Sequence, residues 1–181
     1  MQEIKLSREK ISQVDDNRYE ELNRYTWSAF WSGTNWYAVT WIDGVFIYMH
    51  RYLMKAPKGQ RVDHKDRNGL NNQSHNLRYC TGSQNNMNRA VQSNKINSIY
   101  KGVYKYGVLW NARVQINRKN ISAGNYDLER DAGIAYNHLA KKHFGEFAFF
   151  NDIPDWENIN PTPRKFPVTN TSGYLGVSWN K

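Results

Sequence analysis

Short runs of alternating apolar and polar residues dominate the first fifty positions of the chain. Such alternation is typical of half-buried β-strands. The predicted strands are residues 4–6, 10–14, 27–31, 36–42 and 45–49. Asp43-Gly44 favours a tight hairpin turn between the last two, and Asp15 or Asp16 is suited to cap a short helix that runs to Tyr25. Residues 1–47 are therefore predicted to form a small β-rich module.

The pattern changes over residues 48–91. Residues 50–54 are predicted to form one or two helical turns that end before Pro57 and Gly59. Residues 61–64 have the pattern of a strand, 65–76 form a polar loop rich in Asn and Gly, and 77–79 have the pattern of a returning strand. Ser83 is then placed to cap a helix that carries Asn85 and extends to Val91. The predicted order is strand, loop, strand, helix.

A third pattern follows the polar linker at residues 92–97. Strands are predicted at 100–104, 109–116 and 120–124, and a helix from 128 to about 143 has Ala132, Ala135 and Leu139 at helical spacing. Residues 98–151 should therefore form a three-stranded antiparallel sheet packed on one helix. The expected fold class of the whole chain is α+β.

The last part of the chain contains a proline-rich stretch and one internal repeat. Residues 152–170 contain four prolines, a composition typical of a semi-extended linker. The string Ser98-Ile99-Tyr100-Lys101-Gly102-Val103 recurs as Ser172-Gly173-Tyr174-Leu175-Gly176-Val177. Residues 171–181 are therefore interpreted as the truncated start of a second copy of the 98–151 unit.

Charge and cysteine content narrow the class of partner and of metal site. The 25 Lys and Arg residues exceed the 16 Asp and Glu residues, giving a net charge of +9, which favours a nucleic acid or an anionic membrane. No stretch approaches the roughly 18 apolar residues of a membrane span, and the start lacks a signal-peptide core. A soluble, cytoplasmic protein that binds nucleic acid is expected. Cys80 is the single cysteine, so any metal must use oxygen or imidazole ligands.

Residues 63–85 contain the groups that phosphodiester hydrolysis needs, which are a base to activate water and ligands for a cation. Asp63 and His64 are adjacent on a strand and should point to opposite faces. Asp63 is therefore predicted to bind a hard cation such as Mg²⁺, with the amide oxygen of Asn85 as a second ligand. His64 then remains free as general base. Because the protein ligands carry only one formal negative charge, the cation should bind weakly until a DNA phosphate completes the coordination shell of the cation.

The same region resembles the HNH homing endonucleases of phages and mobile introns. The strings that carry this resemblance are Tyr48-Met49-His50-Arg51, Val62-Asp63-His64, Gly69-Leu70-Asn71-Asn72, Asn76-Leu77-Arg78 and Ser83-Gln84-Asn85-Asn86-Met87-Asn88. The resemblance implies a ββα-metal finger over residues 48–91. It makes His64 the general base, Asp63 and Asn85 the ligands of Mg²⁺ or Mn²⁺, and Asn76 the residue that braces the loop and the imidazole.

Other polar residues near this motif have less specific interpretations. Arg78 is expected to point outward from its strand and to contact DNA. The motif residues Asn71, Asn72 and Asn88 are expected to cap or turn the backbone rather than touch metal. His50 matches a family position, but a structural role and a role at the active site are equally compatible with the sequence.

Residues 98–151 resemble a second family, the ethylene-response-factor (Apetala-two type) DNA-binding domain. The strings that match are Tyr100-Lys101-Gly102-Val103, Trp110-Asn111-Ala112-Arg113-Val114, Ala123-Gly124-Asn125-Tyr126, Asp131-Ala132, Ala135-Tyr136-Asn137 and Phe144-Gly145-Glu146. The resemblance implies that the sheet lies in the major groove of duplex DNA. The side chains expected to face DNA are Lys101, Tyr104, Arg113, Gln115, Asn120 and Ser122, and Lys105 near a strand end is expected to contact phosphate. Several of these positions differ from the plant domains, so base specificity does not carry over.

Three functions remain compatible with the sequence. The leading hypothesis is a metal-dependent DNA endonuclease in a phage-infected or bacterial cell, targeted by the sheet domain. The alternatives are a DNA-binding regulator with an inactive nuclease module and an RNA-binding protein. A single finger provides one active site, so a monomer should nick one strand, and cutting both strands would require a weak dimer or a second event.

Overall fold

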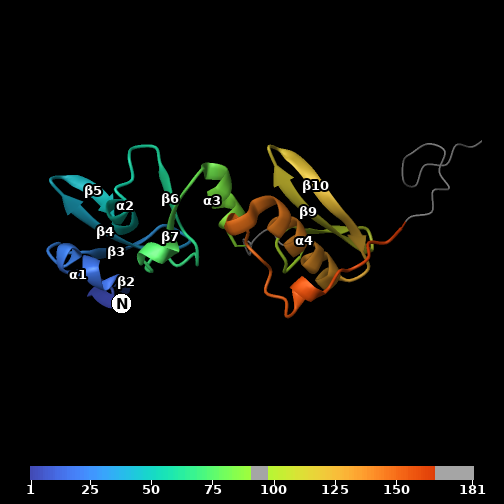
Figure 1. Ribbon diagram of the computed structural model, residues 1–181, viewed down its shortest axis with the longest axis horizontal. Helices are drawn as coiled ribbons and strands as arrows, with labels where there is room; N and C mark the ends of the chain where they lie inside the picture. The colour runs from blue at the N-terminus through green and yellow to red at the C-terminus, as the bar shows by residue number, and fades with distance from the viewer. Residues whose placement is uncertain (91–97, 166–181) are drawn as a thin grey trace, which may run out of the picture. The chain divides into compact units, whose positions relative to one another are not determined.

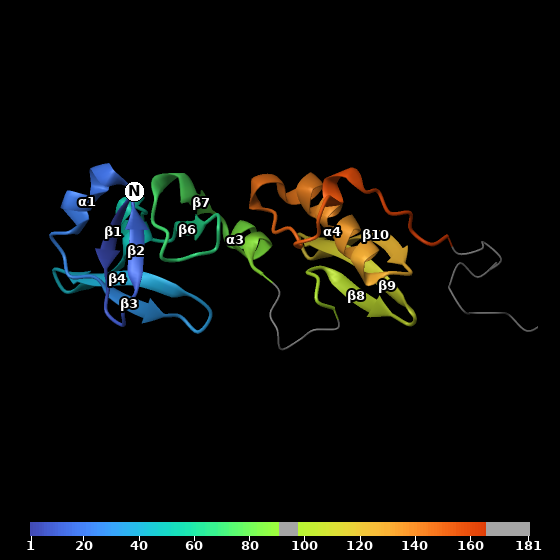
Figure 2. The ribbon, with the colours of Figure 1, turned by 90° about the horizontal axis from the view of Figure 1, so that it is seen from below.

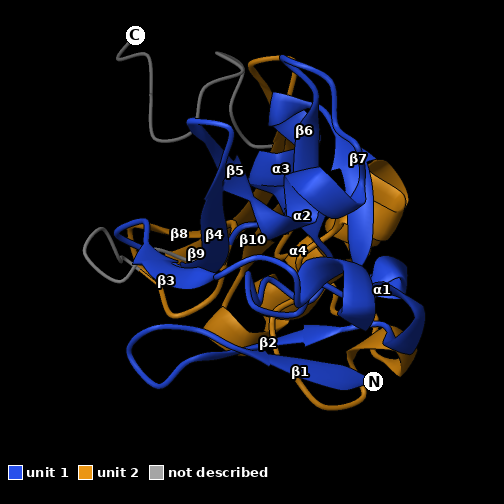
Figure 3. Ribbon diagram, turned by 90° about the vertical axis from the view of Figure 1, so that its left-hand side faces the viewer, with its two compact units in different colours: residues 1–89 blue, residues 90–181 orange. Residues whose placement is uncertain are grey.

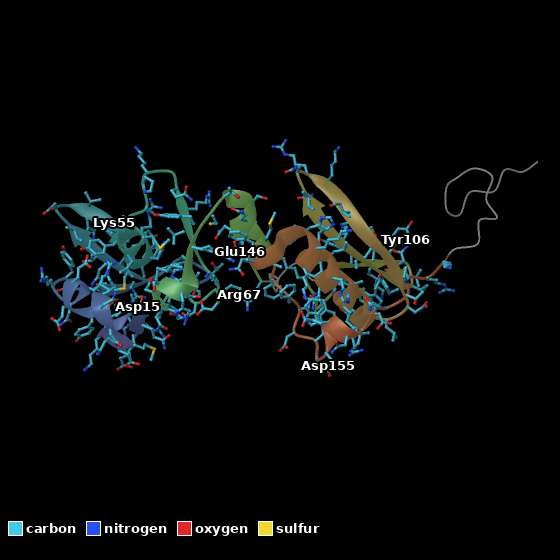
Figure 4. The ribbon with its side chains drawn as sticks, viewed as in Figure 1. Asp15, Lys55, Arg67, Tyr106, Glu146 and Asp155 are labelled. Atoms are coloured by element: carbon cyan, nitrogen blue, oxygen red, sulfur yellow. The ribbon has the colours of Figure 1, made fainter. Side chains whose placement is uncertain are left out.

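The computed structural model describes residues 1–90 and 98–165 of the 181-residue chain. It divides into unit 1 (Met1–Arg89) and unit 2 (Ala90–Lys181), which Figure 3 colours separately. Each unit combines helices with small antiparallel sheets, so the expected α+β class is confirmed. The predicted linker at 92–97 and the predicted repeat at 171–181 lie outside the described residues.

The N-terminal half of unit 1 contains a hairpin, a three-stranded meander and two short helices (Figure 1). The elements are β1 (Gln2–Lys5), β2 (Ile11–Val14), α1 (Asp16–Leu22), β3 (Ser28–Trp31), β4 (Trp36–Ile42), β5 (Val45–Tyr48) and α2 (Met49–Leu53). β1 pairs with β2, and β4 lies between β3 and β5. The predicted hairpin turn at Asp43-Gly44 is present, and both residues have positive φ.

One apolar core holds these elements together. Its buried members are Ile4, Leu6, Val14, Leu22, Trp27, Ala29, Ala38 and Met49. Helix α1 ends at Leu22 rather than at Tyr25. The Leu22 carbonyl accepts hydrogen bonds from the Tyr25 amide (3.1 Å) and from Nε1 of Trp27 (2.8 Å), which turn the chain back toward the core.

The second half of unit 1 has the predicted order of strand, loop, strand and helix. β6 (Arg61–His64) pairs with β7 (Leu77–Cys80), a 3-10 turn η1 (Ser74–Asn76) precedes β7, and α3 (Gly82–Asn88) follows it. The predicted cap Ser83 is wrong. Thr81 caps α3, because its hydroxyl accepts from the Gln84 amide while the Gln84 side chain accepts from the Thr81 amide.

Unit 2 contains the predicted sheet and helix. β8 (Val103–Tyr106), β9 (Leu109–Ile116) and β10 (Lys119–Tyr126) form an antiparallel sheet with β9 in the centre. Helix α4 (Glu129–Phe144) covers one face of the sheet in both Figure 1 and Figure 2. Gly102, just before β8, has a φ of +72° and lies so close to the Tyr136 ring that a Cβ there would collide with it. This contact explains the glycine of the Tyr-Lys-Gly-Val string.

The described part of the proline-rich stretch packs on unit 2. It contains the 3-10 turn η4 (Trp156–Asn158) after η3 (Gly145–Phe147). Ile153 is buried, and Arg164 bonds to the Asn125 carbonyl (2.7 Å) and to Asp127 (2.9 Å). The expected linker composition therefore occurs in a segment that is fixed to the domain as far as Arg164.

Candidate active site

Asp63 lies in a buried ion pair in the two-stranded sheet β6–β7. Its Oδ2 accepts from Nε (3.0 Å) and Nη2 (2.8 Å) of Arg78, and each side chain is 9% exposed. The expected outward orientation of Arg78 is wrong. Asp63 and Arg78 are direct cross-strand partners and share a face, and a buried carboxylate requires a compensating charge. The DNA-binding role of Arg78 stays a prediction.

Asn88 joins helix α3 to this carboxylate. Its Nδ2 lies 3.2 and 3.1 Å from the two Asp63 oxygens and also donates to the backbone carbonyls of His64 (2.9 Å) and Lys65 (3.3 Å). The sequence predicted a capping or turning role for Asn88, whereas the structure places it inside the site. Asn85 is half-buried and stands three residues earlier, on the same side of α3.

His64 is surrounded by different groups from those around Asp63. Its Nε2 lies 3.3 Å from Oδ1 of Asn72, and its ring centroid is 5.0 Å from His50 and 5.9 Å from Tyr37. Burial lowers the pKa of His64 below its ordinary value of 6.5, although the Asn72 hydrogen bond and nearby acidic groups act in the opposite direction. The imidazole is therefore neutral near pH 7, the state that a general base requires.

His50 is a second buried imidazole beside His64. Burial, with smaller contributions from His64 and Arg51, lowers the pKa of His50 to about 3. Its ring packs at 5.3 Å from Tyr48 and 5.6 Å from Tyr37. The structure thus brings the family position His50 next to the candidate base as an uncharged neighbour.

Asn76 holds the loop that follows His64. Its Oδ1 accepts from the Asp66 amide (3.0 Å), and its Nδ2 donates to Asp66 Oδ1 (2.9 Å) and to the Asn71 carbonyl (2.8 Å). Its own carbonyl accepts from the Lys65 amide. These bonds hold the loop together, and the predicted role of Asn76 in bracing the imidazole stays a prediction. The side chain that contacts the imidazole is Asn72, for which the sequence predicts the role of a turn residue.

Comparison with known proteins places this geometry in a family. The family model described as HNH endonuclease matches residues 55–87, a range that contains Asp63, His64, Asn76 and Asn85. An uncharacterized HNH endonuclease of Acanthamoeba polyphaga mimivirus is 33% identical over 148 residues, covering 77% of this chain and 74% of that protein. The chain belongs to the HNH endonuclease family.

The similarity to the viral HNH endonuclease extends beyond unit 1. Because 77% of the chain is more than the 89 residues of unit 1, the alignment must include part of unit 2. No solved structure matches the chain. Within the described residues, no helix has the length and apolar character needed to cross a membrane.

The oxygen donors of the HNH site have the chemistry of ligands for a hard divalent cation. In the described parts of the chain, no group of three or more His, Cys, Asp and Glu side chains converges as a metal cluster. The available donors are the Asp63 carboxylate and the amide oxygens of Asn85 and Asn88, which suit Mg²⁺ or Mn²⁺ better than Zn²⁺. Arg78 neutralises much of the carboxylate charge. Side chains of this type suit a hard cation, and metal binding by Asp63 and Asn85 stays a prediction.

Unit 2 of this HNH endonuclease presents one polar sheet face away from α4. Ala112 and Val114 are buried, so the alternating residues of β9 point to the opposite face. The register places five of the residues expected to face DNA on that opposite face, where Tyr104 pairs with Asn111, Ser122 with Arg113 and Asn120 with Gln115. The Arg113 guanidinium stacks 3.9 Å over the Tyr104 ring.

The two lysines expected to contact DNA lie elsewhere on unit 2. Lys105 pairs with Trp110 in the register and therefore alternates to the other face, where its Nζ lies 5.6 Å from the Trp110 ring. Lys101 precedes β8 and its Nζ lies 5.2 Å from the Phe149 ring. Five of the eight predicted DNA-binding residues thus share one face, and Arg78, Lys101 and Lys105 do not belong to that group.

Proposed function

We propose that this chain is a divalent-metal-dependent DNA endonuclease that resembles homing endonucleases. In this proposal unit 1 contains the ββα-metal finger and cleaves the phosphodiester, while the open face of the unit 2 sheet binds duplex DNA. The observation that carries the proposal is the pairing of a buried, neutral His64 with the Asp63 carboxylate next to it. Asn88 bonds to both, through the His64 carbonyl and the Asp63 side chain.

His64 acts as the general base. Burial lowers its pKa, so the imidazole accepts a proton from the attacking water without first losing one of its own. Asn76 holds the loop after His64 and so limits movement of the ring. A base in this position contributes about a hundredfold or more to the rate.

Asp63 and Asn85 hold the cation. When bound, the cation supplies positive charge to the scissile phosphate and to the leaving oxygen. Asp63 already bonds to Arg78 and Asn88, so its carboxylate offers little net charge to a free ion. We therefore expect weak metal binding by the protein alone and tighter binding when a DNA phosphate adds its own charge.

The open face of β8–β10 supports a DNA-anchoring role for unit 2. Tyr104, Arg113, Gln115, Asn120 and Ser122 lie on it together, and the chain carries a net charge of +9. Guanidinium and amide side chains are suited to phosphate and base-edge contacts. The Apetala-two resemblance of this unit and a phage or bacterial setting stay predictions.

Supercoiled plasmid incubated with Mg²⁺ tests the nuclease proposal. The wild-type protein should convert it to the nicked form, and His64→Ala should reduce the rate about a hundredfold or more. His75→Ala is the matched control, because His75 is an exposed imidazole outside the hydrogen-bond network around His64. Equal rates for wild type and His64→Ala would show that His64 is not the base.

A further inference from the structure

Asn72 is the most deeply buried polar residue next to the candidate base. Its relative exposure is 1%, and that of Ser12, to which it bonds, is 0%. Asn72 comes from the loop between β6 and β7, whereas Ser12 comes from β2 in the N-terminal hairpin. The two segments are fixed to each other by backbone bonds from Gln13 N to Leu70 O (2.9 Å) and from Asn72 N to Gln13 O (2.8 Å). The N-terminal hairpin therefore sets the position of Asn72.

Ser12 determines which way the Asn72 amide faces. The Ser12 hydroxyl lies 3.0 Å from the Leu70 carbonyl and 3.3 Å from Sδ of Met49, and both of these groups accept hydrogen bonds. Since the hydroxyl proton is used there, Oγ is left to accept from Nδ2 of Asn72, at 2.8 Å. The amide oxygen of Asn72 is thereby turned toward His64.

The amide orientation then fixes the location of the proton on His64. Oδ1 of Asn72 is only an acceptor, so the ring nitrogen 3.3 Å away, Nε2, must carry the hydrogen. In a neutral imidazole the other nitrogen, Nδ1, holds the lone pair. A chain of hydrogen bonds therefore links the Leu70 carbonyl, Ser12, Asn72 and His64, and it selects a single tautomer of His64.

We propose that Asn72 is a positioning residue that selects the Nε2–H tautomer of His64 and leaves Nδ1 as the atom that accepts the proton from water. This inference rests on the proposed function, in which His64 is the general base. Ser12 acts one step further away by orienting the amide. The nuclease site therefore depends on a residue of the N-terminal hairpin, which lies outside residues 55–87 matched by the family model.

The tautomer is measured directly by nitrogen NMR of the full-length protein with ¹⁵N-labelled histidine. The chain has five histidines, and the His64 signals are identified by their loss in His64→Gln. Long-range correlations from the ring nitrogens to the carbon-bound ring protons distinguish the two neutral tautomers. The wild-type spectrum should show the proton on Nε2, and a proton on Nδ1 would overturn the inference whether or not the variants at residue 72 fold.

Variants at residue 72 then test whether Asn72 is the cause. Asn72→Leu removes the acceptor and should give a mixture of tautomers, whereas Asn72→Asp keeps an acceptor and should retain the proton on Nε2. Asn71→Leu is the matched control, because the Asn71 side chain bonds to Asp66 and to the Gln73 amide rather than to His64. An unchanged tautomer in a folded Asn72→Leu protein would refute the inference.

Cleavage assays on the same proteins separate this inference from the proposed function. Loss of a group that orients a functional histidine costs about 10–100-fold, so Asn72→Leu should cut plasmid about that much more slowly, with kcat rather than KM affected. Asn72→Asp should retain more activity than Asn72→Leu. An Nε2–H tautomer in a wild-type protein whose cleavage does not depend on His64 would contradict the proposed function while leaving the tautomer assignment in place.

Discussion

At the scale of single residues, Asp63 and Arg78 form a buried ion pair in unit 1. Both side chains are 9% exposed, and removing one partner of a buried pair leaves the other charge without compensation. Arg78→Met keeps much of the apolar stem and should lower the free energy of unfolding by about 3–5 kcal/mol in urea titrations.

An exposed ion pair provides the control for this variant. Arg18 and Glu21 form a pair whose side chains are 28% and 42% exposed, so Arg18→Met should cost less than about 1 kcal/mol. Adding Asp63→Asn to Arg78→Met removes the unpaired charge and should recover part of the lost stability. Similar losses for Arg78→Met and Arg18→Met would show that the Asp63–Arg78 pair is not important for folding.

The buried His50 predicts how stability depends on pH. Its pKa is about 3 in the folded protein against 6.5 ordinarily, so the unfolded chain binds more protons between these values. The contribution of neutral His50 to the free energy of unfolding is fully present above pH 6.5. As the pH falls from 6.5 toward 3, the free energy of unfolding decreases by at most about 1.4 kcal/mol per pH unit. His50→Leu should therefore flatten the pH dependence of urea unfolding in this window, and a slope identical to wild type would contradict the assignment.

At the scale of elements, helix α3 depends on its N-terminal cap. Thr81→Ala removes the hydroxyl that accepts from the Gln84 amide and should lower the free energy of unfolding by about 1 kcal/mol. Ser83→Ala is the matched control, since Ser83 is exposed within the first turn and should change it by less than about 0.5 kcal/mol. If Ser83→Ala proved the more destabilising of the two, the capping box would be assigned to the wrong residue.

The sequence predicted the elements well where alternation or turn chemistry was strong. β4, β6 and β9 have the bounds that the pattern predicted, and so does the Asp43-Gly44 turn. The errors fall at helix ends and at some strand bounds: the strand predicted at 4–6 is β1 at Gln2–Lys5, and the strand predicted at 100–104 is β8 at Val103–Tyr106. Both Thr81 and Ser83 are suitable cap residues, and the extended backbone of Thr81, with a ψ of 166°, together with its bonds to Gln84 distinguishes them.

The site was less predictable than the elements because its contacts join distant segments. The motif pointed to Asp63 and His64, but the direction of Arg78 depended on the cross-strand register and on the cost of burying a carboxylate. Asn72 resembled a turn residue because nothing in its neighbourhood reveals Ser12, which lies 60 residues earlier in the chain.

At the scale of the whole molecule, the proposed function assigns cleavage to unit 1 and DNA anchoring to unit 2. Arg113→Ala removes a cation from the open sheet face and should weaken duplex binding. The logarithm of the DNA association constant should then fall less steeply with the logarithm of the salt concentration, with a slope smaller in magnitude by about one. Lys141→Ala is the control, because Lys141 is an exposed residue of α4 that pairs with Glu157. Salt slopes that are equal for Arg113→Ala and wild type would place the DNA contact on another surface.

The most direct test of His64 as the general base is the initial rate of Mg²⁺-dependent plasmid nicking by wild type and by His64→Gly, each measured with and without added imidazole. We predict that His64→Gly is slower by about a hundredfold or more, that imidazole restores part of this loss, and that imidazole leaves the wild-type rate unchanged. Equal nicking by the two proteins, or negligible nicking by both, would contradict the claim that His64 is the general base of an active nuclease.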